Sequence, residues 1–558
     1  MVRTVKNICC VGAGYVGGPT CAVVASKNED VDVTVVDLSQ PRIDAWNSSQ
    51  LPIYEPGLQE IVEFARDGSD QRRSNLHFST DVRGAIQKAD LIFISVNTPT
   101  KTVGVGAGRA ADIKYVEAAA REIAEVATSD KIIVEKSTVP CGTSEILRDI
   151  FEAVGEPHVR FDVLSNPEFL AEGTAIADLL SPDRILIGSE GTPEGLEAAN
   201  ALADVYAAWV PRERIRADVN IWSSELAKLA ANCMLAQRIS SINSLSAICE
   251  ATGANIKEIS HSVGLDKRIG PNFLKASIGF GGSCFKKDVL NLVYMAETLH
   301  LPEVASYWKA VVDINEWQKD RFAKHIIRAL NSTVEGKRIA ILGLAYKKNT
   351  GDTRESPAIA FIGQMLSERA QLAIYDPKVS YDRILRELGD EFGHEAVAKY
   401  VKPCESAYAA CERASAVAIM TEWDEFKTDQ LTPRPTLDLR DLTVSKLSTT
   451  PVAKRADSTS SAPSSQSEDN MSSDEEGRQC PSTPPTNTSS PTTELSDPTK
   501  PLSDGSTPTR LDWARISTLM RRPRLVFDGR NVVEAPKLRS LGFLVQSIGQ
   551  RSEGLLRR

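Results

Sequence analysis

The chain has 558 residues, of which 42% are hydrophobic and 6% aromatic, and its formal net charge is −9. A single hydrophobic core stops growing at about 250 to 300 residues, so this length predicts two or three domains. The acidic balance excludes a general nucleic-acid-binding protein, because binding to phosphate backbones needs a large surplus of Lys and Arg.

The ten cysteines occur singly or as the pair Cys9 and Cys10, without CxxC spacing or a cluster with His. This pattern indicates neither a metal site nor a disulfide framework. Reduced thiols are typical of intracellular proteins, so we expect a cytoplasmic location.

The uncharged segment from Ile8 to Ser26 follows Arg3 and Lys6 and ends in small residues, as a secretory signal does. Its four glycines and Pro19 make a poor signal core, which favours the alternative of a folded segment. No other stretch approaches the roughly 20 apolar residues of a membrane span, so we expect no membrane association.

The first 40 residues predict a strand, a glycine turn, a helix and a second strand, in KNICCVGAG, YVGGPTCAVVASK and VDVTVVD. Two further apolar runs, ADLIFISVNTP and KIIVEKSTVP, are bounded by turn residues and fit buried parallel strands. This alternation of strands and helices predicts an α/β fold with a doubly wound, Rossmann-like sheet.

Gly12, Gly14 and Gly17 in GAGYVG have the GxGxxG spacing between the first strand and helix. Such glycines allow a tight turn and bring backbone N–H groups close to a pyrophosphate. Asp37, twenty residues beyond Gly17, would bind a ribose 2′-hydroxyl and repel a 2′-phosphate, which favours NAD over NADP. The alternatives are FAD and a glycine turn that serves only helix packing.

Glu168 and Glu172 lie four residues apart in LSNPEFLAEGTAIADLL, and we expect them to share a helix face if this segment is helical. Lys228 and Asn232 have the same spacing in a segment from 211 to 253 that has no internal Gly or Pro. That segment predicts a long helix joining two domains. The pair could donate hydrogen bonds to a developing oxyanion, whereas the alternative for both pairs is a solvated helix surface.

The stretch GFGGSCFKKD places Cys284 after a glycine-rich turn and near the first turn of a helix predicted in FKKDVLNLVYMAETL. The helix dipole and the two lysines that follow would lower the pKa of the thiol. Asp288, one turn later, could act as a base or proton relay. The alternative is a buried, inert cysteine.

A dinucleotide site together with an activated cysteine indicates a four-electron oxidation. An alcohol oxidised to an aldehyde can be captured by a thiolate, oxidised again to a thioester and hydrolysed to an acid.

The C-terminal part repeats the first pattern, since KRIAILGLAYK and AQLAIYDP predict strands that end at Gly343 and Asp376. Residues 446–509 are rich in Ser, Thr and Pro, which predicts a disordered segment. Its SSDEE stretch and its Ser-Pro and Thr-Pro pairs predict phosphorylation. RLVFD predicts another strand after it, so the segment interrupts a domain.

Nine motifs in order carry a resemblance: GAGYVGGPT, NTPTK, KSTVP, NPEFLAEGTAI, ELAKLAAN, QRISSINS, FLKASIGFGGSCFKKD, GDTRESPA and FDGR. The chain closely resembles the eukaryotic UDP-glucose 6-dehydrogenases of the UDP-glucose/GDP-mannose dehydrogenase family. The resemblance covers about 6–426 and 511–549 and implies that UDP-glucose, two NAD+ and water give UDP-glucuronate, a precursor of polysaccharides and glycans, and two NADH.

The resemblance also implies residue roles. Cys284 matches the nucleophile, Lys228 and Asn232 the oxyanion pair, Asp288 and Thr138 groups that act on water, and Glu168 the acid/base and hydrolytic residue. The residues matched to NAD binding are Gly12, Ala13, Gly14, Tyr15, Val16, Gly17, Asp37, Arg42, Val96, Asn97, Thr98, Pro99, Ser137, Thr138, Val139, Glu172 and Arg354. Those matched to the UDP-sugar are Glu168, Phe169, Leu170, Ala171, Glu172, Lys228, Asn232, Lys275, Ala276, Ser277, Ile278, Gly279, Lys347 and Arg530, with Arg268 contributed across a dimer interface.

The expected domains are an NAD-binding Rossmann domain (1–213), a central helix with a helical dimerisation domain (214–330) and a UDP-sugar-binding Rossmann-like domain in two parts (331–427 and 511–558), split by the insertion 428–510. The resemblance implies assembly into hexamers built from dimers, so we expect self-association. The insertion replaces a short connector of the animal forms. The resemblance therefore does not predict whether this chain keeps the hexamer-building surfaces. Rival interpretations are a sister dehydrogenase for GDP-mannose or UDP-N-acetylmannosamine, and an inactive NAD-binding scaffold.

Overall fold

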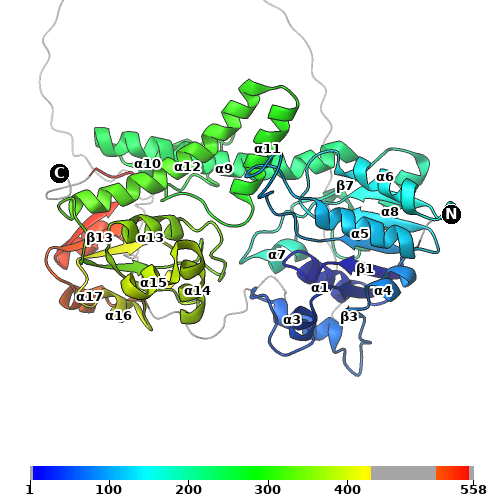
Figure 1. The fold of residues 1–558 in the computed structure, drawn as a ribbon, viewed down its shortest axis with the longest axis horizontal. Helices are drawn as coiled ribbons and strands as arrows, with labels where there is room; N and C mark the ends of the chain where they lie inside the picture. The colour runs from blue at the N-terminus through cyan, green and yellow to red at the C-terminus, as the bar shows by residue number, and fades with distance from the viewer. Residues whose placement is uncertain (1–3, 429–509, 552–558) are drawn as a thin grey trace, which may run out of the picture. The chain divides into compact units, whose positions relative to one another are not determined.

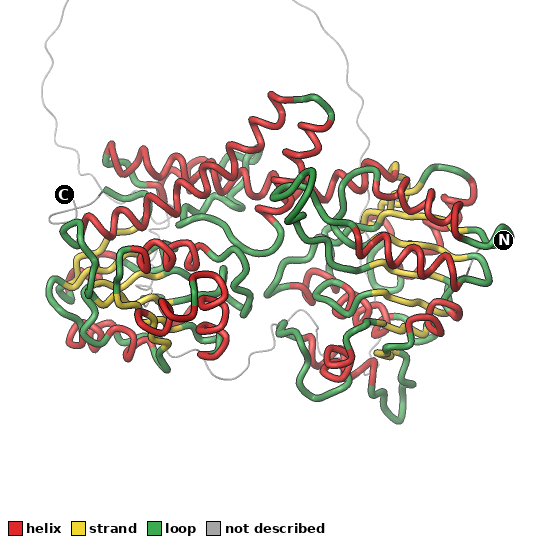
Figure 2. Tube along the Cα trace, viewed as in Figure 1, coloured by secondary structure: helices red, strands yellow, loops and turns green. Residues whose placement is uncertain are grey.

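A computed structural model describes residues 4–428 and 510–551. These residues form two β-sheets of mainly parallel strands, each accompanied by helices (Figures 1 and 2). A set of long helices lies between the two sheets in the sequence. The predicted insertion, with its expected disorder and phosphorylation, lies outside the described residues except at its two ends.

The first sheet has eight strands in the order β3-β2-β1-β4-β5-β6-β7-β8, and each neighbouring pair is parallel except β6 with β7. Its strands are β1 (Asn7–Val11), β2 (Asp32–Val36), β3 (Leu76–Ser79), β4 (Leu91–Ile94), β5 (Lys131–Glu135), β6 (Phe161–Ser165), β7 (Ile185–Ser189) and β8 (Ile215–Asn220). The helices are α1 (Gly17–Lys27), α2 (Gln40–Trp46), α3 (Leu58–Arg66), α4 (Val82–Lys88), α5 (Lys114–Val126), α6 (Thr143–Val154), α7 (Ala175–Leu180) and α8 (Pro193–Ala207). The predicted Rossmann-like unit is confirmed.

Both faces of this sheet are buried, which explains the uninterrupted apolar runs in its strands. Leu91 and Phe93 of β4 belong to a core that includes residues of α1, α3 and α8, whereas Ile92 and Ile94 belong to a second core with α5 and α6. Because successive side chains of a strand point to opposite faces, a strand covered on both sides has to be apolar at every position.

The register of the strands brings several loops to one edge of the sheet. Ile94 lies opposite Glu135, and Glu135 lies opposite Ser165, so β4, β5 and β6 end side by side. The loops that follow them carry most of the predicted site residues of this unit. Ligands of open α/β sheets bind at this carboxyl edge.

The predicted long helix is α9 (Ile221–Thr252), which runs for 32 residues. It ends at Gly253 as predicted but begins later than the segment from 211 suggested, because β8 (Ile215–Asn220) pairs with β7 at the edge of the first sheet. The side chain of Asn220 accepts hydrogen bonds from the first N–H groups of the helix, and Gly253 ends it in a left-handed conformation with φ of 92°. Three further helices, α10 (Ile256–Gly264), α11 (Phe285–Thr298) and α12 (Pro302–Ala329), complete the central part. Among the described residues, no helix has the length and apolar character that a membrane span requires.

The second sheet has six parallel strands in the order β11-β10-β9-β12-β13-β14. Its strands are β9 (Arg338–Leu342), β10 (Gln371–Tyr375), β11 (Val401–Pro403), β12 (Ala416–Ile419), β13 (Arg524–Asp528) and β14 (Phe543–Ser547). The helices are α13 (Pro357–Ser367), α14 (Tyr381–Phe392), α15 (His394–Tyr400), α16 (Ala407–Cys411), α17 (Trp513–Leu519) and α18 (Ala535–Ser540). Since Ala416 of β12 pairs with Leu525 of β13, the chain on both sides of the insertion builds one sheet, as predicted.

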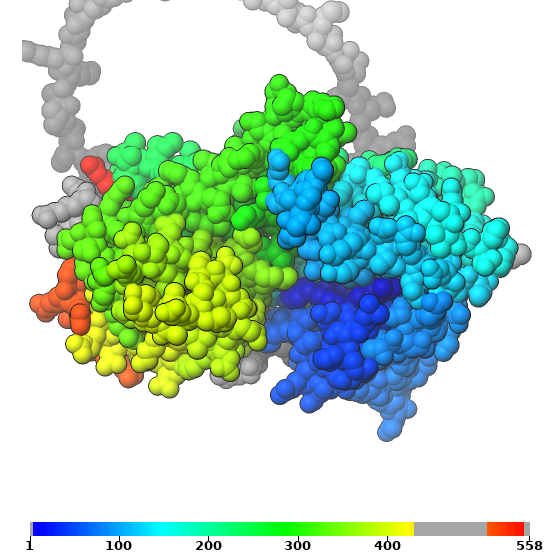
Figure 3. All heavy atoms as spheres, in the orientation of Figure 1, coloured from blue at the N-terminus to red at the C-terminus, as the bar shows by residue number. Residues whose placement is uncertain are grey.

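The segment 101–110, which follows the β4 loop, reaches the central helices. The side chain of Arg109 forms an ion pair with Glu297 of α11, and a Cβ on Gly106 would lie 2.9 Å from the ring of Tyr294. Figure 3 shows this segment at the surface beside the central helices. The NAD-type unit and α11, which carries Cys284 at its start, are therefore in direct contact.

Candidate active site

Of the three GxGxxG glycines after β1, only Gly14 faces open space. A Cβ on Gly12 would lie 2.4 Å from the carbonyl oxygen of Ser95, and one on Gly17 would lie 2.1 Å from that of Gly12. A Cβ on Gly14 would meet nothing within 4 Å. The first and third glycines are thus required by packing, while the open space at Gly14 fits the approach of a pyrophosphate to the start of α1.

Asp37 lies at the end of β2 next to this loop. Its Oδ2 accepts hydrogen bonds from the N–H of Ala13 at 3.1 Å and from the guanidinium of Arg42 at 2.9 Å, and its Oδ1 accepts one from the N–H of Ser39. The corresponding acid of the second unit, Asp376, accepts hydrogen bonds from four donors, which are the N–H groups of Leu344, Ala345 and Lys378 and the indole of Trp423. Asp37 accepts from three, which leaves it more capacity to bind a ribose hydroxyl.

Two further loops predicted to bind NAD are tied to one another and to α11. Ser137 Oγ donates to the carbonyl of Val96 at 2.7 Å, and Thr98 Oγ1 donates to the carbonyl of Thr138 at 2.7 Å. Lys287 Nζ donates to the carbonyl of Thr98 at 3.3 Å. The loops after β4 and β5 therefore lie beside the start of α11.

Cys284 directly precedes α11 and its side chain is exposed, so the alternative of a buried cysteine is wrong. The turn before it packs closely on the loop after β9. A Cβ on Gly281 would lie 2.4 Å from the carbonyl oxygen of Glu355, and one on Gly282, where φ is 86°, would lie 2.9 Å from the ring of Tyr346. The glycines are needed for this close approach, and the approach fixes the position of Cys284.

The two lysines after Cys284 form ion pairs with carboxylates, and their expected effect on the thiol stays a prediction. Lys286 forms an ion pair with Glu355 at 2.9 Å, and Lys287 forms one with Asp288 at 3.4 Å. The cations that interact electrostatically with Cys284 are Lys228 of α9 and Arg354. Both come from distant parts of the chain, which is why local sequence could not place them beside the thiol.

Lys228, Asn232 and Asp288 form a buried cluster beside Cys284. Each is less than 10% exposed, so a solvated helix surface is excluded for this pair of α9 residues. Asn232 Nδ2 donates to Asp288 Oδ2 at 2.6 Å. Burial lowers the pKa of Lys228, although Cys284, Asp288 and Glu168 oppose this shift. The cluster offers an ammonium and an amide as donors next to a thiol.

Glu168 and Glu172 lie in an irregular loop, so the predicted shared helix face is wrong. Helix α7 begins only at Ala175, because the buried carboxylate of Glu55 accepts hydrogen bonds from the N–H groups of Gly173 and Ala175. Glu168 instead forms a buried ion pair with Lys136 at 2.9 Å. Lys136 was missed in the sequence, where its only signal was a lysine inside the apolar run KIIVEKSTVP.

Glu172 faces the second α/β unit. It forms an ion pair with Arg354 at 3.4 Å, and the same arginine binds Asp352 at 2.7 Å. Burial, together with the neighbouring Asp352, raises the pKa of Glu172 to about 7. The hydroxyl of Tyr346, which the sequence did not single out, also faces this carboxylate.

The residues predicted to bind the sugar nucleotide fall into two groups. Ala276, Ser277, Ile278 and Gly279 are buried, and the N–H of Ile278 donates to the carbonyl of Gly529. Arg530, the next residue, donates to the carbonyls of Tyr346 at 2.7 Å and Gly279 at 3.4 Å, so FDGR reaches the glycine turn.

The second group consists of the cations Arg268, Lys275 and Lys347, of which Lys347 interacts electrostatically with Glu172. The side chain of Arg268 is 89% exposed and binds Asp266, and that of Lys275 is exposed. Lys347 Nζ lies 5.5 Å from the centre of its neighbouring Tyr346 ring. In the described part of the chain, no group of three or more His, Cys, Asp or Glu side chains could hold a metal ion.

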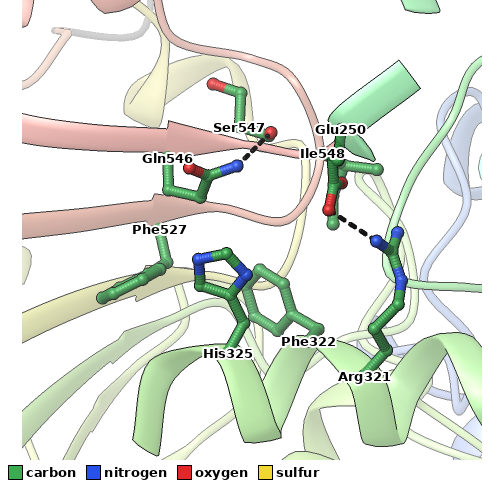
Figure 4. Close-up of a pocket in the computed structure, with 8 residues that line it drawn as sticks. All are labelled: Glu250, Arg321, Phe322, His325, Phe527, Gln546, Ser547 and Ile548. Carbon is green, nitrogen blue, oxygen red and sulfur yellow. Dashed lines mark hydrogen bonds and ion pairs between the residues drawn. The ribbon is translucent and has the colours of Figure 1, made fainter. Parts of the chain in front are cut away.

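A small cavity lies away from these residues, between α9, α12, β13 and β14 (Figure 4). It measures about 10 Å³, which is enough for roughly one water molecule. Arg321 at its edge forms an ion pair with Glu250, so the cavity belongs to the packing of the central helices on the second sheet.

Known proteins resemble this chain in all three parts of the fold. Sequence models of the UDP-glucose/GDP-mannose dehydrogenase family match here as the NAD binding domain (6–210), the central domain (222–317) and the UDP binding domain (340–444). UDP-glucose 6-dehydrogenase 4 of Oryza sativa subsp. japonica is 48% identical over 99% of this chain and 98% of its own. UDP-glucose 6-dehydrogenase of Pongo abelii is 57% identical over 76% of this chain and 85% of its own.

Among solved structures, a UDP-glucose dehydrogenase from Pyrobaculum islandicum superposes with a TM-score of 0.65 at 31% identity, covering 76% of this chain and 91% of its own. The matched domains include both α/β units and the helices that carry the buried cluster at Cys284. The chain therefore belongs to the UDP-glucose/GDP-mannose dehydrogenase family and is an oxidoreductase that uses NAD.

Proposed function

We propose that this chain oxidises UDP-glucose to UDP-glucuronate through a covalent intermediate on Cys284. The observation that carries the proposal is an exposed thiol at the start of α11, beside a buried ammonium and a buried amide held by Asp288. The names of the relatives from rice and orangutan support UDP-glucose as the substrate.

The first α/β unit would hold the cofactor. Gly12, Gly14 and Gly17 offer the close backbone approach that a pyrophosphate needs, and Asp37 offers a carboxylate to the adenosine ribose. Bound NAD+ supplies the electron acceptor for each of the two oxidations. The loops at Val96 to Pro99 and Ser137 to Val139 would cover its nicotinamide half beside α11.

The residues around Cys284 divide the work on the sugar. The Cys284 thiolate adds to the C6 aldehyde and gives a thiohemiacetal, whose oxyanion Lys228 and Asn232 stabilise by hydrogen bonds. Oxidation of this adduct gives a thioester. Water then adds to the thioester carbonyl. One proton of this water passes to Glu168, while Thr138 and Asp288 orient the water molecule.

The second unit would bind the nucleotide. Lys347 and Arg530 supply cations for the diphosphate, with Lys275 at the glycine turn and Arg268 contributed by a second copy of the chain. The loop from Phe169 to Glu172 and the turn from Ala276 to Gly279 would enclose the sugar. We also propose that the enzyme is cytoplasmic, which cell fractionation tests. We propose that it assembles through dimers into hexamers, which a light-scattering mass tests.

The test is NADH formation from NAD+ with UDP-glucose, GDP-mannose and UDP-N-acetylmannosamine in parallel. The proposal expects two NADH per UDP-glucose and little turnover of the other sugars. Turnover of another sugar alone would assign the chain to a sister activity. No turnover with any of them would indicate an inactive, NAD-binding scaffold.

A further inference from the structure

We infer that Lys136, which none of the roles above includes, is a positioning residue that holds Glu168 as an ionised, correctly aimed proton acceptor during thioester hydrolysis. The inference rests on the proposed function, because it concerns the last step of that reaction. It is carried by the contacts of one buried ammonium group.

Lys136 directly follows β5, and the pairing of β5 with β6 sets it beside Asn166, which follows β6. Its Nζ lies 2.9 Å from Glu168 Oε2, 3.1 Å from Asn166 Oδ1 and 3.2 Å from the hydroxyl of Tyr206. The lysine side chain is only 2% exposed. The Nζ also lies 3.3 Å from the carbonyl oxygen of Asn166, so all three donors of the ammonium have partners.

Glu168 is held at both oxygens. Its Oε2 faces Lys136, and its Oε1 accepts a hydrogen bond from the N–H of Phe169 at 2.8 Å. Each carboxylate oxygen has two lone pairs, so one remains on each oxygen for a water molecule. The carboxylate is therefore fixed in direction and still able to accept a proton.

The charged and titratable groups that face Glu168 come from three elements. The cations are Lys136 after β5 and Lys228 on α9, and the third group is the neutral, titratable hydroxyl of Tyr206 on α8. Burial opposes ionisation of Glu168, but Lys136, the N–H of Phe169 and Lys228 outweigh it and lower the pKa of the carboxyl. Glu168 also raises the pKa of Lys136 against the effect of burial, so both partners stay charged.

This arrangement suits a base. In hydrolysis the water oxygen bonds to the thioester carbon while one water proton passes to Glu168. The carbon–sulfur bond then breaks, Cys284 leaves as a thiolate, and the carboxylic acid that forms releases the second water proton to solvent and leaves as a carboxylate. Without Lys136 a buried Glu168 would hold a proton at neutral pH and could not accept another.

The test compares Lys136→Met with Lys131→Met. Lys131 is a second buried lysine of β5, but its Nζ donates to the carbonyls of Ala89 and Gln87 and to Ser129, away from the site. In single-turnover experiments with UDP-glucose and NAD+, hydrolysis of the Cys284 adduct is followed from pH 6 to 9. We expect Lys136→Met to slow hydrolysis about 10- to 100-fold near pH 7 and to recover as the pH rises, with Lys131→Met unchanged.

A wild-type pH profile in active Lys136→Met would overturn the inference. If that variant does not fold, Lys136→Met combined with Glu168→Gln removes both charges and is compared with Glu168→Gln alone. Equal hydrolysis rates support the inference, whereas a further loss would show that Lys136 acts independently of Glu168. Wild-type protein that forms no NADH from UDP-glucose would refute the proposed function itself, which is a separate result.

Discussion

The side-chain amide of Asn232 donates a 2.6 Å hydrogen bond to Oδ2 of Asp288, although the two residues lie 56 positions apart in the chain. This bond joins α9 to α11 directly behind Cys284. It uses one of the two amide protons of Asn232 and orients the other, which the proposed mechanism directs at the substrate oxyanion.

Asn232→Ala should lower kcat by about 100-fold or more with little change in KM, because an oxyanion donor acts in the transition state. It should also reduce the free energy of unfolding by roughly 1 to 3 kcal/mol, since buried Asp288 loses a partner. Steady-state kinetics and urea unfolding measure both. Asn200→Ala on α8, where the amide is exposed, is the control and should change neither. An unchanged kcat in Asn232→Ala would remove the residue from the mechanism.

Gly282 tests whether the close turn positions the thiol. Gly282→Ala places a methyl group against Tyr346 and should lower kcat at least about 10-fold, because a small misplacement of a reacting group is costly. Gly336→Ala is the matched control, since its φ of 69° imposes similar backbone strain in open space. The positive φ should cost both variants about 1 to 2 kcal/mol of stability, and Gly282→Ala should lose more because its methyl group also meets Tyr346. Equal kinetics in the two would show that the turn does not position Cys284.

Asp37 should determine the choice between NAD and NADP. Asp37→Ser removes the acceptor for the ribose hydroxyl and the charge that repels a 2′-phosphate. We expect the KM for NAD to rise about 10- to 100-fold and activity with NADP to appear. Asp32→Ser, at the other end of β2 in an exposed pair with Arg73, should leave both unchanged. Unaltered cofactor preference in Asp37→Ser would contradict the assignment.

Glu172 should make stability depend on pH. Its pKa is raised to about 7 by burial and Asp352, with Arg354, Lys347 and Tyr346 also facing it. A carboxyl with a raised pKa binds more protons in the folded state, so it stabilises the protein below about pH 4.5 and loses that effect as the pH rises to about 7.

The loss should be on the order of 1 to 3 kcal/mol. The free energy of unfolding, measured with heat or urea, should therefore decrease over this pH range more for the wild type than for Glu172→Gln, whose side chain does not titrate. Parallel pH profiles for the two proteins would contradict a raised pKa at Glu172.

The sequence was sufficient where the determinants are local. The glycine loop between β1 and α1, the end of α9 at Gly253 and the start of α11 directly after Cys284 each depend on neighbouring residues. The second unit was predictable for the same reason, since its first two strands are followed directly by Gly343 and Asp376, as those of the first unit are followed by Gly12 and Asp37.

Contacts set by the sheet were not predictable. The ion pair of Lys136 with Glu168 exists because β5 and β6 are neighbours with Glu135 opposite Ser165, and spacing along the chain does not give that register. The same reason explains the wrong helix at Glu168 and Glu172, where Glu55, more than 100 residues away, binds the N–H groups that a helix would use.

Mass spectrometry of a quenched reaction tests the central claim most directly. Glu168→Gln protein is mixed with UDP-glucose and NAD+, quenched in acid and digested. The account predicts a UDP-glucuronyl thioester on the peptide that contains Cys284, and its loss in the Glu168→Gln and Cys284→Ser double variant. An adduct on another residue, or two NADH per UDP-glucose released by Cys284→Ser alone, would contradict it.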